Sequence, residues 1–372
     1  MTADDLSATG TRSPAPEETQ PPFLLFGFGP RRRKLVYARG RLLDAFTLEP
    51  ALDLGRVRDA RIDPVARTVR LDSDGGPELL VEDETGVHAV RGGVRQTLTA
   101  GDPVRLPDFA GHPHAPLLRR MHADLLLCLL PFGPVPNPWV YPRPWYRDAA
   151  MLALVLRRTR NLHLLRDWIL GLSKPYDRNN AGEAEPDNLG QALFLLSLVP
   201  AAEGGGAAHP LVPAILREAE ARRGADGALR GRVDGQERAV YPTKWLKFGL
   251  RALGLDDSAW RIPAEADDYA DLFWMDFRDE PVVFSRDHAS GNALARYPYL
   301  AWAQAHFRGA PPPEDPATLD GSREAMASEA RYDRLAPLVA AGVVPADHAA
   351  RYLSTPHAWH AAEVFLHLTD VP

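Results

Sequence analysis

The stretch Pro144-Trp145-Tyr146-Arg147-Asp148 stands directly before a helical hydrophobic pattern at 149–158. Proline suits the first turn of a helix, because its missing N–H has no partner there and its φ angle is already helical. Similar starts, with a proline and a polar or aromatic cluster before an apolar run, recur at Pro186-Asp187-Asn188, Pro242-Thr243-Lys244, Pro298-Tyr299 and Pro356-His357, and without the proline at Asp267-Asp268-Tyr269. We predict that all six are helix starts.

Hydrophobic residues recur with a helical period of 3.6 from Pro113 onward. About twelve helices are predicted, at 117–130, 149–158, 162–172, 189–199, 211–222, 245–253, 269–277, 300–307, 323–330, 335–341, 346–353 and 359–368. If the six similar starts alternate with returning helices, the chain forms six helical hairpins closed into an (α/α)6 toroid. The inner helices would then gather their N-termini at one end. The alternative is an ordinary helical bundle in which proline only marks turns.

Short alternating apolar runs precede the helical part. Between Phe23 and Pro107 they are separated by turn signals such as Asp74-Gly75-Gly76 and Gly92-Gly93, which is typical of antiparallel strands and hairpins. We therefore expect a mainly α protein with a disordered leader at 1–22, a β-rich, sandwich-like domain at 23–112 and the (α/α)6 domain at 113–372.

Composition excludes several classes of partner. The 372-residue chain carries 43 basic and 49 acidic residues, a net charge of −6 without a long basic run, so a nucleic-acid surface is not expected. The apolar run 125–132 is too short to span a membrane, and the single cysteine, Cys128, is expected to be a buried thiol. With no signal-peptide pattern at the start, the sequence predicts a cytoplasmic protein that binds a neutral molecule or another protein.

The strongest candidate binding cluster is Trp145-Tyr146-Arg147-Asp148. Aromatic faces stack on the C–H face of a sugar, and an Arg–Asp pair supplies hydrogen-bond donors and acceptors to its hydroxyl groups. The alternative is that Asp148 caps the helix and Arg147 is its surface ion-pair partner. The cluster therefore favours a saccharide or glycoside as the ligand.

Trp-Tyr-Arg-Asp-Ala-Ala-Met at 145–151 resembles the Trp-x-Arg-Asp stretch of glucoamylases and other six-hairpin glycosidases. Further segments resemble that family in order and spacing over about 260 residues: 185–191, 297–301 and 357–361. The resemblance implies glycoside hydrolysis, with Arg147 and Asp148 holding the sugar. Many bacterial members also carry a β-sandwich ahead of the helices.

Inverting glycoside hydrolysis requires a carboxylic acid and a carboxylate base on opposite sides of the sugar. The resemblance places the acid at Glu237, although the family's preceding tryptophan and doubled Glu are missing. A surface Glu before a turn is the alternative. Where the family has its base, at 340–345, this chain has no acid, so Asp276 and Glu185 are the candidates.

The remaining candidate ligand-binding side chains are Asp187, Lys244, Trp274, His357, Trp359 and His360. Lys244 and Lys247 lie three apart on one helix face, which suits an acidic sugar. The steps of three between His357, His360 and Glu363 drift around a helix, so neither a metal nor a cofactor is expected. Two alternatives to a hydrolase stay open: an inactive saccharide-binding or scaffold protein, and a sugar epimerase that uses His288, His357 and His360.

Overall fold

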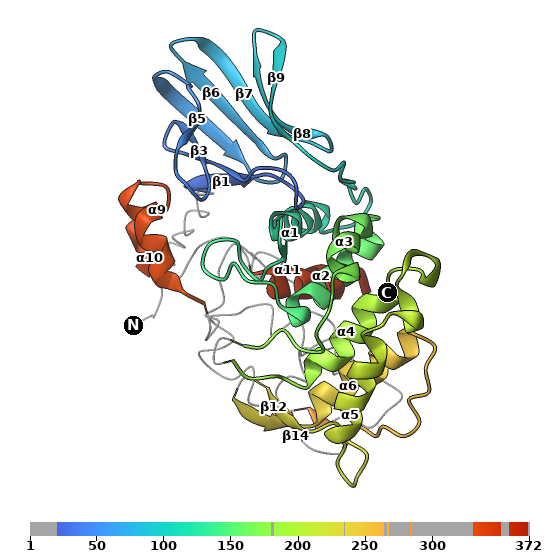
Figure 1. Cartoon of the computed structure of the whole chain (residues 1–372). Coiled ribbons are helices and arrows are strands. Elements are labelled where there is room, and N and C mark those ends of the chain that lie inside the picture. The colour runs from blue at the N-terminus through green and yellow to red at the C-terminus, as the bar shows by residue number, and fades with distance from the viewer. Residues whose placement is uncertain are drawn as a thin grey trace, which may run out of the picture.

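The structure, a computed structural model, describes residues 21–179, 182–233, 235–263, 266–267, 283–284, 330–350 and 357–370. Of these residues 36% are helical and 23% are in strands, so the fold is mixed and the prediction of a mainly α toroid is wrong. Nine strands form two antiparallel sheets at one end of the molecule, and the helices lie below them (Figure 1). The leader at 1–20 lies outside the described residues.

The first nine strands build two antiparallel sheets in simple up-and-down order. One sheet has four strands, β1 (Phe23–Phe26), β2 (Leu35–Ala38), β3 (Arg41–Asp44) and β4 (Pro50–Leu52). The other has five, β5 (Val57–Asp63), β6 (Thr68–Ser73), β7 (Gly76–Glu82), β8 (Gly86–Arg91) and β9 (Val94–Ala100). Gly92 and Gly93, both with positive φ, form the two-residue turn between β8 and β9, a conformation that glycine adopts without steric cost.

The four-stranded sheet is a middle layer that is buried on both faces. Alternate residues of β1 and β2 pack into the core shared with the five-stranded sheet: Leu24, Phe26, Leu35 and Tyr37. The residues between them pack into the larger core shared with the helices: Leu25, Val36 and Ala38. This period of two follows from the pleat, which sends successive side chains to opposite faces of a strand. The layers are therefore sheet, sheet and helices.

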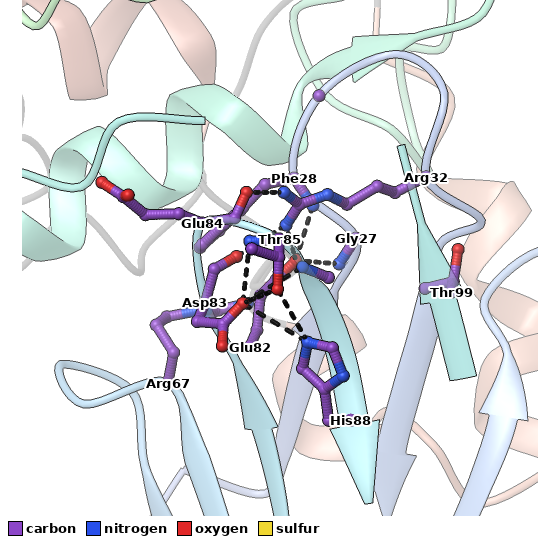
Figure 2. A network of polar contacts seen from close by, with 12 residues as sticks. Gly27, Phe28, Arg32, Arg67, Glu82, Asp83, Glu84, Thr85, His88 and Thr99 are labelled. Atoms are coloured by element: carbon purple, nitrogen blue, oxygen red, sulfur yellow. Dashed lines mark hydrogen bonds and ion pairs between the residues drawn. The ribbon is translucent and has the colours of Figure 1, made fainter. Parts of the chain in front are cut away.

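A buried carboxylate ties the two sheets together (Figure 2). Glu82, at the end of β7, accepts hydrogen bonds from the backbone N–H groups of Gly27 and Phe28 at 2.8 and 2.6 Å. Its other oxygen accepts from the Arg67 guanidinium at 2.9 Å, and Arg32 lies 3.7 Å away. Because the Glu82 side chain is fully buried, these contacts replace the water that its charge would otherwise require.

The helical part contains six α-helices before residue 263 and three after residue 330, within the described residues. The first six are α1 (Ala115–Leu127), α2 (Tyr146–Arg158), α3 (Arg166–Leu170), α4 (Asp187–Ser197), α5 (Val212–Ala221) and α6 (Val240–Ala252). The last three are α9 (Ala336–Ala340), α10 (Ala346–Ala350) and α11 (Ala358–Asp370), and short 3-10 helices lie at 162–165, 201–203, 206–208 and 332–335. The helices predicted at 269–277, 300–307 and 323–330 fall almost entirely outside the described residues.

Small antiparallel hairpins interrupt this helical part. They pair β10 (Leu129–Leu130) with β11 (Gly133–Pro134), and β12 (Gly231–Val233) with β13 (Gln236–Arg238). A two-stranded parallel ladder joins β14 (Ala266–Asp267) to β15 (Val283–Phe284). Pro131, Gly133 and Pro134 end the helix that was predicted to continue to 130, because proline lacks the N–H that a helix or a central strand needs.

Five helices pack side by side in the order α1, α11, α2, α4, α6. Figure 1 shows the C-terminal helix α11 between α1 and α2, although about 200 residues of sequence separate α11 from α2. Helices α4 and α6 approach most closely where two glycines meet. A Cβ atom on Gly190 would lie 2.1 Å from the carbonyl carbon of Trp245, and one on Gly249 would lie 2.4 Å from the Gly190 oxygen. Only glycine permits this backbone contact.

Candidate functional site

The N-terminal ends of α2, α4 and α11 meet in a buried polar cluster. Arg147, in the first turn of α2, forms an ion pair of 2.7 Å with Glu185 and lies 3.9 Å from Asp187, the first residue of α4. Asp148, also in the first turn of α2, lies 3.4 Å from Nδ1 of His357, the residue before α11. Helix starts that are far apart in the sequence therefore bring these side chains together.

The chain between α3 and α4 fixes the geometry of the cluster. Asp177 accepts a 2.5 Å hydrogen bond from the backbone N–H of Tyr146, the first residue of α2, and so caps a helix whose own N-cap residue, Trp145, makes no side-chain cap. The N–H of Asp177 donates to Asn188 in α4 at 3.2 Å. Asn179 donates to Glu185 at 3.3 Å. The loop thereby ties the start of α2 to the start of α4.

Aromatic rings flank the polar groups. The guanidinium of Arg147 lies over the Trp145 ring at 5.5 Å, and Tyr141 contacts both Trp145 and His357, with ring centroids 5.3 and 6.2 Å apart. Trp359 packs near Tyr241 of α6 at 6.5 Å, which brings the start of α6 beside that of α11. The cluster therefore has apolar walls on more than one side.

Burial changes the proton affinities of the acidic groups. It raises the pKa of Asp187 to about 7 and that of Asp177 to about 6, although Arg147 acts in the opposite direction on both. Oδ2 of Asp187 accepts from Gln191 at 2.9 Å, whereas Oδ1 is buried and accepts no hydrogen bond within the described part of the chain. Asp187 is therefore a carboxyl group that keeps its proton close to neutral pH.

The histidine of the cluster is neutral at physiological pH. Burial and the positive charge of Arg147 lower the pKa of His357 to about 3. Its Nδ1 accepts a 3.2 Å hydrogen bond from the backbone N–H of Trp359, which fixes the ring at the start of α11. Such a weakly basic ring is a poor match for the acid–base role that the epimerase alternative assigns to it.

Glu237, the predicted acid, does not join this cluster. It is exposed on β13, directly opposite Arg232 in the β12–β13 hairpin. Its carboxylate is therefore exposed to water, unlike the buried carboxyl groups of Glu185 and Asp187.

The two lysines expected to share a ligand lie on α6, and both are buried. Lys247 is used structurally, since its ammonium group contacts Asp257 and the Trp260 carbonyl oxygen, each at 2.9 Å. Lys244 is 2% exposed in the second turn of the helix. The candidates Trp274 and Asp276, together with His288 and the side chain of His360, lie outside the described residues.

Several members of the cluster were not predicted as functional residues. Asp177 and Asn179 belong to a stretch rich in Asp, Asn and Gly that reads as an ordinary loop. Asn188 and Gln191 could have been found from the sequence, because they are polar residues within the apolar pattern of α4. The structure buries both side chains completely. Buried polar groups require partners, so polar residues inside an apolar pattern indicate a polar interior.

No group of three or more His, Cys, Asp or Glu side chains within the described residues is arranged to hold a metal ion. None of the helices in this part of the chain is long and apolar enough to cross a membrane. Comparison with protein-family models, curated proteins and solved structures gave no match. The resemblance to six-hairpin glycosidases therefore stays a prediction, and the function is argued from the cluster alone.

Proposed function

We propose that this protein is an enzyme that acts on a carbohydrate by carboxylate acid–base catalysis, most simply a glycoside hydrolase. One observation carries the proposal: three helix starts distant in sequence converge on Arg147, Asp148, Glu185, Asp187 and His357. Desolvating three carboxyl groups and an arginine costs stability unless every charge is compensated, and such costly clusters are concentrated at functional sites.

The acidic groups of the cluster have different environments, as acid–base catalysis requires. Asp187 is the proposed proton donor, because burial favours its protonated form. Glu185 is the proposed base: Oε2 accepts from Arg147 at 2.7 Å and Oε1 accepts from Asn179 at 3.3 Å, which orients the carboxylate. Cleavage of a glycosidic bond requires such a proton donor and such a carboxylate, one on each side of the sugar.

The substrate class follows from the remaining side chains. Trp145 and Trp359 are aromatic neighbours of the polar cluster, and Arg147 and Asp148 carry its hydrogen-bond donors and acceptors. Saccharides combine an apolar C–H face with rings of hydroxyl groups, so this mixture suits them.

The experiment measures release of the leaving group from a panel of aryl glycosides by the full chain, by Asp187→Asn and by Glu185→Gln. Asp167→Asn, which changes an exposed carboxylate on α3, is the control. We expect Asp187→Asn to lose about 100-fold or more in kcat on glycosides with poor leaving groups, and much less on dinitrophenyl glycosides, which need no proton donor. The wild-type rate should fall as the pH rises through about 7, where Asp187 loses its proton.

Equal loss on good and poor leaving groups would show that Asp187 is not the proton donor. If no glycoside in the panel is turned over but saccharides still bind, the protein is a saccharide-binding protein and not an enzyme. Turnover that survives both substitutions would place the chemistry elsewhere in the chain.

A further inference from the structure

A second site lies at the opposite end of α2 from the polar cluster. There a groove of about 770 Å³ is lined by the linker that follows the β-sheets and by the turn that follows α2. Its basic residues are Arg105, Arg158, Arg160 and His163, against one acidic residue, Glu84. Glu84 is engaged by the linker, since its carboxylate accepts from the backbone N–H of Leu106 at 3.0 Å. The groove is therefore electropositive.

The backbone of Arg160 is the most informative feature of this groove. Helix α2 ends in a Schellman motif, in which the N–H of Asn161 donates to the Leu156 oxygen at 2.7 Å and that of Arg160 to the Arg157 oxygen at 3.3 Å. This motif puts Arg160 in the left-handed region, with φ of +58°. Glycine is the usual residue at that position, and a residue with a Cβ atom is strained there. Arginine at this position costs conformational energy, as it does at Arg39, Arg67 and Arg178, which share the left-handed conformation.

The guanidinium groups of Arg105 and Arg160 are not used by the fold. Neither makes a side-chain hydrogen bond or ion pair within the described residues, whereas Arg158 donates to Thr369 at 2.7 Å. The backbone of Arg105 is nevertheless fixed, because its N–H and its oxygen both pair with the buried amide of Asn161, at 2.7 and 2.9 Å. Two available guanidinium groups are thus held on a rigid frame at one groove.

The linker that carries Arg105 also supplies the apolar part of the groove lining: Pro103, Val104, Leu106, Pro107 and Phe109. The two prolines restrict the linker, and Phe109 is itself held with φ of +56° by packing against Phe365, with ring centroids 5.5 Å apart. A ligand that fits must offer an anionic end and an apolar body.

We propose that this groove binds a phosphate monoester, with the phosphate between Arg105 and Arg160 and the organic part against Phe109 and the prolines. The planar guanidinium fork matches the oxygens of a phosphate and forms paired, charge-assisted hydrogen bonds with it. The volume exceeds that of a phosphate ion, which leaves room for the organic part. The site is independent of the polar cluster, so it stands or falls separately from the proposed enzymatic function.

Isothermal titration calorimetry of the full chain with phenyl phosphate, inorganic phosphate and phenol tests the proposal. Phenyl phosphate should bind saturably and more tightly than inorganic phosphate, and phenol should not bind. Arg160→Gly and Arg105→Ala should each raise the Kd for phenyl phosphate about tenfold or more, because each removes a charged hydrogen-bond donor. Arg217→Ala, which removes an exposed arginine on α5, should change the Kd less than about twofold.

Thermal unfolding of Arg160→Gly separates binding from folding. Because glycine relieves the left-handed strain, the midpoint of this variant should be no lower than that of the wild type, while its ligand affinity falls. Wild-type protein without saturable phenyl phosphate binding would overturn the proposal. So would equal affinities for phenyl phosphate and inorganic phosphate, or equal effects of Arg160→Gly and Arg217→Ala.

Discussion

Replacing Asp187 by asparagine removes one ionisable group from the polar cluster and keeps its shape. The asparagine oxygen retains an acceptor for the 2.9 Å hydrogen bond from Gln191. In the wild-type protein, burial raises the pKa of Asp187 from 3.8 to about 7. The folded protein therefore holds a proton that the unfolded chain releases across this interval, and the free energy of unfolding decreases as the pH rises.

The sign and size follow from this difference in proton binding. The raised pKa contributes stability that is fully present below 3.8, the value of the unfolded chain, and is lost as the pH rises through about 7. One pKa unit corresponds to about 1.4 kcal/mol, so the Asp187 contribution falls by roughly 3 kcal/mol between pH 5 and pH 8. Asparagine does not titrate, so Asp187→Asn lacks this loss.

The assay is urea unfolding of both proteins at pH 5 and pH 8, followed by tryptophan fluorescence. The quantity compared is the wild-type free energy of unfolding minus that of Asp187→Asn, in which the titrating groups distant from the polar cluster cancel. We expect this difference in the free energy of unfolding to be lower at pH 8 than at pH 5 by roughly 3 kcal/mol. Asp226→Asn is the control, because Arg230 and the Ala228 N–H lower the pKa of the exposed Asp226, which is then charged at both pH values. A difference that stays constant or increases with pH would refute the role of burial.

Three further substitutions test buried contacts elsewhere in the fold. Gly190→Ala should destabilise the fold by about 3 kcal/mol or more, since its Cβ would overlap the backbone of α6, whereas Gly171→Ala, with its nearest atoms at 3.4 Å, should be tolerated in urea unfolding. Glu82→Gln should lower the free energy of unfolding by roughly 3–5 kcal/mol, because it leaves buried guanidinium groups uncompensated. The control, Glu203→Gln at an exposed position, should lower it by less than about 1 kcal/mol. A similar loss for both variants would contradict the buried network. Burial lowers the pKa of His122 to about 3. The free energy of unfolding of the wild type should therefore fall relative to that of His122→Gln as the pH drops from about 6.5 toward 3. If the difference between the two proteins does not change with pH, His122 is not buried in its neutral form.

Local sequence patterns predicted the starts of α2 and α4 but not the assembly of the helices, and the helix start predicted at Asp267 is wrong, because Ala266–Asp267 forms the strand β14. The clusters at Asp148 and Asp187 open α2 and α4 as expected, because proline and acidic residues favour a first helical turn and an apolar run then propagates it. The prediction of a toroid is wrong because helical periodicity indicates which face of a helix is buried but not which neighbouring element packs against that face. The order α1, α11, α2 depends on a contact between the end of the chain and its middle, which no local pattern encodes.

The candidate site was predicted in part for the same reason. Arg147 and Asp148 stood out because an Arg–Asp pair directly follows two aromatic residues before an apolar helical pattern. Glu185 and Asp187 stood out only as acids near another helix start, and nothing in the sequence showed that Arg147 would contact both. The prediction of Glu237 as the acid depended on its spacing in the resemblance to six-hairpin glycosidases, and spacing does not reveal that the residue lies on an exposed hairpin.

The loop at 27–33 connects the five-stranded sheet to α1, and this connection limits where the chain can be truncated. Glu82 holds the loop from the sheet side, and the N–H of Gly29 donates to the Leu126 oxygen of α1 from the other side at 3.0 Å. A fragment cut before α1 would lose that second anchor and would expose the apolar surface of Leu25 and Val36 to water. The strands are thus not a module that can be separated from α1, and truncated forms of the protein should keep α1 with them.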